Sequence, residues 1–204
     1  MTDENPASQL ATHRSGPPLG ERAGADDRAT SAVAAPAPRR VMVVGCAGAG
    51  KSTITVALNR AHGLPIVHLD RLYWKPGWQR SPDDEWELVL RELVAEDAWI
   101  HDGNYDSTMD FRLPRADLVV FVDTPRRRCL YRAVKRRLVG NRIHDIPGCP
   151  ENLDREFFGY VWRFPTVHRP RLLERLAGHP NVVRLRTRRE VRRFLAGLAA
   201  PSPG

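Results

Sequence analysis

The sequence predicts a three-layer α/β fold, in which a five-stranded parallel sheet is covered by helices on both faces. Three observations support this prediction. After about residue 40, short apolar segments alternate with segments of helical period, a glycine-rich loop follows the first apolar segment, and an aspartate follows several of the others. Such alternation is typical of parallel sheets, in which ligands bind at the carboxyl ends of the strands.

The chain separates into one domain and two tails. Residues 1–38 are rich in Ala, Pro, Gly and Ser and show no period of a helix or a strand, so we expect a disordered tail there and another at residues 199–204. Residues 39–198 form the predicted domain. Hydrophobic residues make up 42% of the chain, which is enough to cover a sheet with helices.

The predicted strands are short and mostly apolar, and four of them end at a residue of special chemistry. The first strand runs straight into Gly45, and the next three are followed by Asp70, Asp102 and Asp123. The five strands cover residues 41–44, 65–69, 98–101, 118–122 and 182–185.

The predicted helices have apolar residues at helical spacing. The first begins after the glycine-rich loop and closes at His62-Gly63, the second opens at Ser81-Pro82, and the last follows the fifth strand. Their apolar faces are Ile54, Ala57, Leu58 and Ala61; Trp86, Val89, Leu90, Leu93 and Val94; and Val191, Phe194, Leu195 and Leu198. A further core face is formed by Phe157, Tyr160, Val161 and Phe164.

The glycine-rich loop matches the pattern G-x-x-x-x-G-K-[S/T] in full, between the strand and the helix that a P-loop requires. Its backbone N–H groups are expected to cradle phosphates at the positive end of the helix dipole, Lys51 to reach the β- and γ-oxygens, and the hydroxyl of Ser52 to bind Mg²⁺. The predicted nucleotide site contains Gly45, Cys46, Ala47, Gly48, Ala49, Gly50, Lys51, Ser52 and Thr53. The sequence therefore predicts a P-loop NTPase fold with ATP and Mg²⁺ as ligands.

Charge and cysteine content narrow the class of protein. The net charge is +8, and residues 126–193 hold nineteen Lys or Arg against six Asp or Glu, a surplus that fits a nucleotide and a nucleic acid equally. No motif supports nucleic-acid readout. Three widely spaced cysteines argue against a disulfide scaffold. The lack of a long apolar run argues against a signal peptide and a membrane span, so we expect a cytoplasmic protein.

A P-loop needs an acidic partner on a neighbouring strand for its metal, and two aspartates compete for this role. Asp123 ends the more apolar strand, whereas Asp102 is followed by Gly103-Asn104-Tyr105, a loop that could approach a second substrate.

Several motifs resemble known P-loop phosphotransferases. Asp102-Gly103 after the third strand and Asp123-Thr124-Pro125 after the fourth, before an Arg-rich helix, are similar to the adenylate-kinase-like branch. More closely, the region of roughly residues 40–198 resembles the topology modulation protein family of small kinases. The motifs that match it are His68-Leu-Asp70-x-Leu-x-Trp74-x-Pro-Gly-Trp78, Asp102-Gly-Asn-Tyr105, Arg112-Leu-Pro-Arg-Ala-Asp117 and Pro147-Gly-Cys-Pro-Glu151.

The resemblance implies a nucleoside-monophosphate-kinase-like fold with a short lid at about residues 140–155. It also implies that Asp102 lies near magnesium and that Arg132 and Arg136 face the nucleotide. The resemblance does not imply a known substrate. The Gly-x-Pro-Arg form of the adenylate kinase motif is replaced here by Asn104-Tyr105, which places an AMP-type acceptor site in doubt.

Residue chemistry adds further candidates. Arg136 and Arg142 are expected to stabilise charge on the transferred phosphoryl group. Arg132 is expected either to stack on adenine or to lie on a solvated helix face. Asp70 is expected to orient or deprotonate an acceptor hydroxyl, or to contact a sugar or an amine.

Other residues near the acceptor leave alternatives open. Arg112 is expected to bind an anionic acceptor or to pair with a nearby Asp. Trp74 and Trp78 fit a wall for a flat or apolar acceptor and core packing equally well. His68 and His101 are assigned no role, because a histidine within a strand is more often a core residue.

The leading interpretation is an ATP-dependent kinase that phosphorylates a small acceptor, with a nucleoside or nucleotide as one candidate. The predicted acceptor contacts are Asp70, Asn104, Tyr105 and Arg112. The alternative is a nucleotide-dependent regulatory protein whose basic C-terminal half binds nucleic acid or a protein partner. A monomer or weak dimer is expected.

Overall fold

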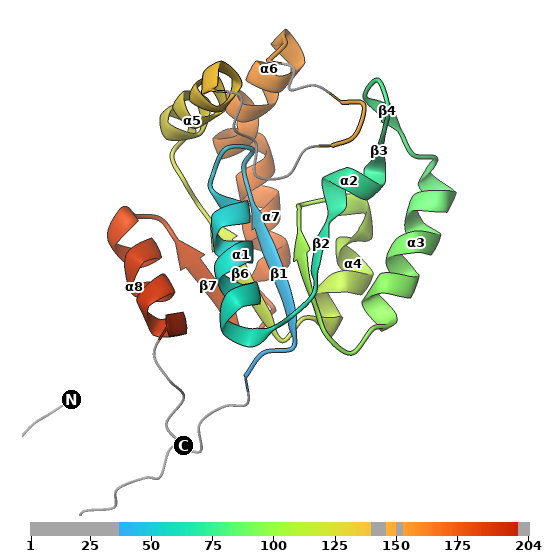
Figure 1. Cartoon of the computed structure of the whole chain (residues 1–204), viewed down its shortest axis with the longest axis vertical. Coiled ribbons are helices and arrows are strands. Elements are labelled where there is room, and N and C mark those ends of the chain that lie inside the picture. The colour runs from blue at the N-terminus through green and yellow to red at the C-terminus, as the bar shows by residue number, and fades with distance from the viewer. Residues whose placement is uncertain (1–36, 140–145, 150–152, 200–204) are drawn as a thin grey trace, which may run out of the picture. The chain divides into compact units, whose positions relative to one another are not determined.

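A parallel sheet occupies the centre of the structure, a computed structural model in which residues 37–139, 146–149 and 153–199 are described (Figure 1). Within these residues the sheet has five strands in the order β2-β5-β1-β6-β7, and every neighbouring pair is parallel. Their bounds are β1 (Arg40–Gly45), β2 (Ile66–His68), β5 (Trp99–Asp102), β6 (Leu118–Val122) and β7 (Val182–Leu185).

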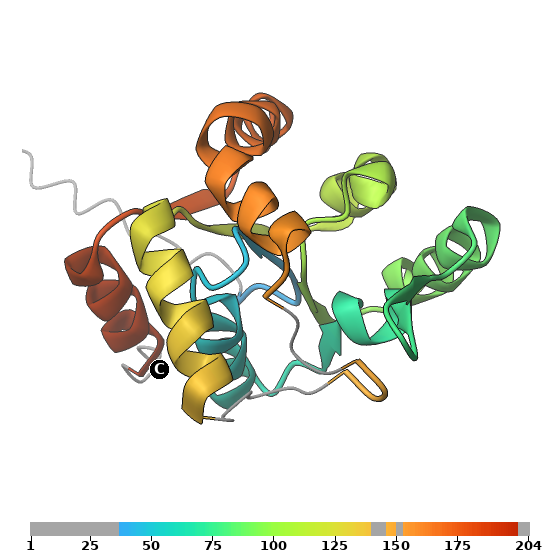
Figure 2. The ribbon, with the colours of Figure 1, turned by 90° about the horizontal axis from the view of Figure 1, so that it is seen from above.

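Helices cover both faces of this sheet. α1 (Lys51–His62) and α8 (Arg188–Ala199) pack together on one face, and α7 (Arg169–Leu176) lies on the other, as Figure 2 shows. The predicted three-layer P-loop NTPase fold with a five-stranded parallel sheet is therefore confirmed within the described residues.

The remaining helices and turns connect the strands. α5 (Arg126–Val139) and α6 (Arg155–Arg163) stand at the carboxyl ends (Figure 1). The others are α2 (Leu69–Tyr73), α3 (Asp83–Ala95), α4 (Met109–Arg112), the 3₁₀ turns η1 (Asp106–Thr108) and η2 (Leu113–Arg115), and the π-helical segment η3 (Phe164–His168), which leads into α7.

The core explains why the central strands read as continuous apolar runs. Val41–Val44 of β1 and Val119–Phe121 of β6 have no exposed surface, because helices cover both faces of a parallel sheet. The register pairs Val43 of β1 with Asp102 of β5, and His68 of β2 with the same Asp102. β2 and β5 therefore end level, β1 continues two residues further to Gly45, and the residues that follow these three strands meet at one edge.

One local expectation was wrong. The second strand stops at His68, and Asp70 lies in the short helix α2 rather than at a strand end. α3 begins at Asp83, directly after the predicted Ser81-Pro82 opening, and the hydroxyl of Ser81 donates to the carbonyls of Leu72 and Tyr73, at 3.3 and 2.9 Å. These bonds close an antiparallel hairpin, β3 (Trp74–Lys75) and β4 (Gln79–Arg80), that the sequence analysis did not predict.

Parts of the predicted organisation lie outside the described residues. These are residues 1–36 and 200–204 of the expected tails and residues 140–145 and 150–152 of the expected lid, including Arg142. In the described part of the chain, no helix combines the length and the apolar character that crossing a membrane would need.

Candidate active site

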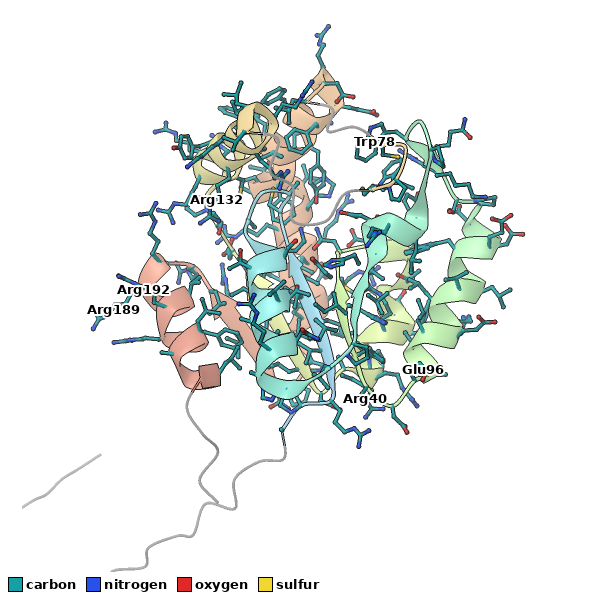
Figure 3. All side chains as sticks on the ribbon, in the orientation of Figure 1. Arg40, Trp78, Glu96, Arg132, Arg189 and Arg192 are labelled. Carbon is teal, nitrogen blue, oxygen red and sulfur yellow. The ribbon has the colours of Figure 1, made fainter. Side chains whose placement is uncertain are left out.

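A cavity of about 1350 Å³ opens at the carboxyl ends of the strands. The P-loop lies in its middle, because β1 is the central strand of the sheet. The cavity extends from there in two directions. We call the part toward the β2 edge, with Asp70, Tyr73, Trp74, Trp78 and Arg80, the β2 arm, and the part toward the β7 edge, with Arg132, Arg136, Arg186, Thr187, Arg188 and Arg192, the β7 arm. Figure 3 shows Trp78 and Arg132 on opposite sides of the end of β1.

The P-loop depends on glycine for its path. Gly45 has φ +146° and Gly48 has φ +75°, and a Cβ at either position would meet a backbone oxygen at 2.5 Å, that of Val122 and that of Cys129 respectively. The loop is therefore pressed directly against β6 and α5. Ala47 through Thr53 line the cavity, whereas Gly45 and Cys46 lie buried beneath it.

Lys51 and Arg132 bring positive charge to this loop. The ammonium of Lys51, the first residue of α1, donates to the carbonyls of Gly45 and Cys46 at 3.2 and 3.3 Å. The guanidinium of Arg132 donates to the carbonyl of Ala49 at 2.6 Å, and the hydroxyl of Thr124 donates to the same oxygen at 2.9 Å. Arg132 thus reaches from α5 to the P-loop and lines the cavity beside it.

Ser52 and Asp102 meet at the start of the β2 arm. The Ser52 hydroxyl donates to Oδ2 of Asp102 at 3.2 Å, and Nδ1 of His68 lies 3.2 Å from the same oxygen. The structure therefore brings together both residues predicted to serve a metal. His68, to which the sequence analysis assigned no role, lines the same cavity and contacts this pair because β2 and β5 end level.

Asp123 is engaged elsewhere. Its carboxylate accepts bonds from Nη2 of Arg184 at 2.6 Å and from Nε of Arg169 at 3.1 Å, and its side chain is 9% exposed. Of the two candidate aspartates, only Asp102 contacts the P-loop serine among the described residues. Asp123 instead joins β6 to β7 and α7.

Asp70 lies in the β2 arm and is held by Tyr105. The phenol of Tyr105 donates to Oδ1 of Asp70 at 2.6 Å. Burial raises the pKa of Tyr105 above its usual range, and the negative charge of Asp70 raises it further, so the phenol remains a neutral donor. Two of the four residues predicted to contact the phosphoryl acceptor therefore form one hydrogen-bonded pair in the cavity.

Asn104 connects the loop after β5 to the P-loop. Its amide oxygen accepts from the backbone N–H of Gly45 at 2.8 Å, and its amide nitrogen donates to the carbonyl of Gly45 at 3.0 Å and to the hydroxyl of Tyr160 at 3.1 Å. Asn104 lines the cavity, but these bonds occupy its amide. Asn104 therefore positions the loop after β5 against the P-loop. Its predicted contact with the phosphoryl acceptor stays a prediction.

Arg112 does not reach the cavity, which corrects the prediction that it contacts an acceptor. Its side chain is fully buried, and its guanidinium donates to the carbonyls of Gly103 at 3.5 Å, of Asn104, and of Tyr105 at 3.2 Å. Burial lowers the pKa of Arg112 to about 10, against the opposing influence of Tyr105 and Asp106. Arg112 therefore fixes the loop that presents Asn104 and Tyr105.

The β7 arm contains residues that the sequence analysis missed. Arg136 lines it as expected, but Arg186, Thr187, Arg188 and Arg192 around the start of α8 also line it. Thr187 and Glu190 form a reciprocal cap: the Thr187 hydroxyl accepts from the Glu190 N–H at 3.1 Å, and the Glu190 carboxylate accepts from the Thr187 N–H at 3.1 Å. The spacing Thr-x-x-Glu was a signal that could have located this helix start.

A hairpin and part of the expected lid close the far end of the β2 arm. The rings of Trp74 and Trp78 lie 5.4 Å apart at 73°, and both line the cavity. The N–H of Gly77 donates to the carbonyl of Gly148 at 2.9 Å, and the Cys149 thiol donates to the carbonyl of Lys75 at 3.1 Å. Residues 146–149 are therefore attached to the hairpin.

A metal ion at the Ser52–Asp102 pair would have few protein ligands. Among the described residues, no group of three His, Cys, Asp or Glu side chains is close enough to hold an ion. A hydroxyl and a carboxylate oxygen, as in Ser52 and Asp102, are hard donors that suit Mg²⁺, which keeps several of its waters and is bound through one or two protein oxygens together with phosphates. The donor set therefore fits the predicted ion.

Comparison with known proteins supports the fold. Neither a protein-family model nor a curated protein sequence matches the chain. Among solved structures, shikimate kinase from Acinetobacter baumannii, in complex with shikimate, has a TM-score of 0.55 at 16% identity, over 78% of this chain and 90% of that one. A gluconokinase from Sinorhizobium meliloti 1021 has a TM-score of 0.47 at 21% identity, over 80% and 93%.

The fold and the loop together define the class of protein. A five-stranded parallel sheet in the order β2-β5-β1-β6-β7, with Gly45–Ser52 between its central strand and α1, is a P-loop NTPase fold. The chain shares this fold with shikimate kinase.

Proposed function

We propose that the protein is an ATP-dependent kinase that transfers the γ-phosphoryl group of ATP to a hydroxyl of a small acceptor. The observation that carries the proposal is that the P-loop and the Asp70–Tyr105 pair line one cavity. A phosphate-binding loop and a carboxylate that accepts a hydroxyl proton are the two parts that such a transfer requires.

The phosphates are assigned to the P-loop. Backbone N–H groups from Ala47 to Ser52 and the N-terminus of α1 supply partial positive charge, and Lys51 supplies a full charge that can move from the Gly45 and Cys46 carbonyls to phosphate oxygens. Arg132 and Arg136 extend this charge into the β7 arm, which we assign to the rest of the nucleotide. Arg142, outside the described residues, stays a candidate for the same electrostatic role.

Ser52 and Asp102 are assigned to Mg²⁺. Their oxygens lie 3.2 Å apart at the junction of the P-loop and the β2 arm, which supports a shared role in holding the ion and its waters. Bound Mg²⁺ supplies charge that neutralises the phosphate oxygens.

Asp70 is assigned as the proton acceptor. The acceptor oxygen forms a bond to the γ-phosphorus, the bond from that phosphorus to the β,γ-bridging oxygen breaks, and ADP leaves with the electron pair. The hydroxyl proton passes to Asp70 and then to solvent, so the products are ADP, a phosphorylated acceptor and one proton. Tyr105 orients Asp70 through their 2.6 Å hydrogen bond.

We also propose membership in the topology modulation protein family, on the motifs that its resemblance rests on. Asp70, Trp74, Trp78 and the segment 102–105, which belong to these motifs, all line the cavity. A set of matching residues that gathers at one site supports a shared activity better than the same residues scattered over the surface would.

The test is ATP consumption with Mg²⁺ across a panel of small hydroxyl compounds that includes nucleosides, nucleotides and shikimate, with Lys51→Ala beside the wild type. Acceptor-dependent formation of ADP that Lys51→Ala abolishes is the expected result. Tight ATP binding that no acceptor converts to turnover would instead favour the nucleotide-dependent regulatory protein, whose basic residues would bind nucleic acid or a protein partner.

A further inference from the structure

The tip of the β2 arm is formed by a hairpin with two different faces. Trp74 pairs with Arg80 and Lys75 with Gln79, and side chains of a directly paired couple share one face. Trp74 and Arg80 line the cavity. Lys75, on the outer face, is ion-paired with Glu85 at 2.8 Å. The hairpin therefore presents an indole and a guanidinium together to the cavity.

Trp78 completes an aromatic corner. It sits at the hairpin turn with φ +60°, a left-handed conformation that is uncommon for a bulky residue and that persists only where the surroundings hold it. This conformation places the ring of Trp78 at 73° to that of Trp74, with centroids 5.4 Å apart. A flat ring can stack on one of two such faces and direct its edge at the other.

The hairpin that carries the corner is packed against neighbouring residues on both sides. Tyr73 contacts Trp74 edge-on at 5.0 Å, and the same tyrosine contacts Trp86 at 5.1 Å and Tyr105 at 4.9 Å. On the other side of the hairpin, Gly148 packs against Pro76, since a Cβ on Gly148 would lie 2.7 Å from the Cβ of Pro76. A preformed wall binds a ligand with a smaller loss of conformational entropy.

From this geometry we infer that the acceptor is a planar aromatic or heteroaromatic compound that carries an acidic group and a hydroxyl. The ring lies in the corner of Trp74 and Trp78, the acidic group meets Arg80, and the hydroxyl meets Asp70. The choice of hydroxyl rests on the proposed kinase activity. The ring and acid sites rest on the hairpin alone.

Binding is tested separately from turnover, by calorimetric titration of the full chain saturated with Mg²⁺ and a non-hydrolysable ATP analogue, so that the P-loop site is filled. One arm compares 4-(hydroxymethyl)benzoate with its ring-saturated analogue, 4-(hydroxymethyl)cyclohexanecarboxylate. The other compares nucleoside 5′-monophosphates with ribose 5-phosphate. The arm in which the ring-bearing compound binds more tightly identifies the source of the aromatic group.

We expect the ring to improve affinity about tenfold in one arm. Trp74→Leu and Trp78→Leu should remove this advantage, whereas Trp162→Leu, at an indole that is 55% exposed on α6, should keep it. Arg80→Gln should weaken binding of 4-(hydroxymethyl)benzoate but not of uncharged 1,4-benzenedimethanol. Gln79→Ala, on the outer face, is the matched control. Circular dichroism checks that each variant is folded.

Three outcomes would overturn the inference. The ring-bearing and ring-free compounds bind equally in both arms, neither ring-bearing compound binds, or folded Trp74→Leu keeps the tighter binding of the ring-bearing compound. Failure of the proposed function looks different. Trp74-dependent binding without ADP formation would reject the kinase and keep the aromatic site. Efficient phosphorylation of ring-free acceptors alone would keep the kinase and reject the aromatic site.

Discussion

The hydroxyl of Tyr105 donates to the carboxylate of Asp70 at 2.6 Å and so joins the loop after β5 to helix α2 after β2. These two strands are neighbours in the sheet, with His68 paired to Asp102, which is why residues 35 positions apart in the sequence meet. The bond uses one of the two carboxylate oxygens and fixes the direction of the other.

Tyr105→Phe should lower kcat of the phosphotransfer while leaving the fold intact. A hydrogen bond to a charged group contributes about 1.5–3 kcal/mol, which corresponds to a decrease of roughly tenfold to a hundredfold if it is needed to orient Asp70. Initial rates at saturating ATP measure the effect. Tyr131→Phe, at a phenol on α5 that is 65% exposed, is the control. Equal rates in all three proteins would remove Tyr105 from the mechanism.

Asp102→Asn and Asp123→Asn should have opposite signatures. Asp102→Asn should raise the Mg²⁺ concentration for half-maximal activity by about tenfold or more, since Asp102 contacts Ser52 at the proposed ion site. Asp123→Asn should leave that concentration unchanged and lower the free energy of unfolding by about 1–3 kcal/mol, because Arg169 and Arg184 lose their carboxylate. A Mg²⁺ effect from Asp123→Asn alone would reverse the assignment.

Arg112→Met should destabilise the protein rather than weaken acceptor binding selectively. The guanidinium donates to three backbone carbonyls in a fully buried environment. Leaving them without donors should cost about 2–4 kcal/mol, measured by urea unfolding. Arg115→Met, which removes an exposed guanidinium near the carbonyl of Ala95, is the control. Wild-type stability together with a raised KM would restore the predicted role in acceptor binding.

His101 should make the protein sensitive to acid. It is fully buried, it stacks on Trp99 at 3.9 Å, and burial lowers its pKa to about 3, with the charge of Arg112 adding to the effect. Between pH 6.5 and 3 the unfolded chain binds a proton at this position that the folded chain does not, so stability falls as pH falls.

From pH 7 to pH 5 the loss due to His101 should be about 2 kcal/mol. His101→Leu should remove that part of the pH dependence, whatever it does to stability at pH 7. Urea unfolding of both proteins at pH 5 and pH 7 decides the question. An identical pH dependence in the two proteins would contradict the role given to His101.

The parts of the fold that the sequence predicted are those with a repeating physical signal. Val41–Val44 and Val119–Val122 are buried on both faces and therefore read as unbroken apolar runs. The loop Gly45–Ser52 must be glycine-rich, because β6 and α5 leave no room for side chains at Gly45 and Gly48. Strands of two residues have no such signal. The hairpin with Trp74 and Arg80 was missed for that reason.

Site residues could be predicted where a sequence motif or a strand end defines them. Residues whose place in the site depends on tertiary packing could not. Lys51 and Ser52 follow from the P-loop motif. The strand ends offered both Asp102 and Asp123, and only the family resemblance favoured Asp102. Arg112 looked like an acceptor ligand, but its guanidinium contacts the carbonyls of residues 103–105. It does so because η1 and α4 turn the chain back onto this loop, and such short helical turns have no period in the sequence. His68 joined the site only through the register of β2 on β5, which sequence spacing does not encode.

The position of β1 in the middle of the sheet has a kinetic consequence. Because the β2 arm and the β7 arm lie on opposite sides of the P-loop, either substrate of the proposed kinase can enter without passing the other. Double-reciprocal plots of initial rate should intersect, because a direct transfer needs both substrates bound at once, and product inhibition should follow a random order of addition rather than a compulsory one. A P-loop at the edge of the sheet would have placed both substrates on one side and favoured a compulsory order.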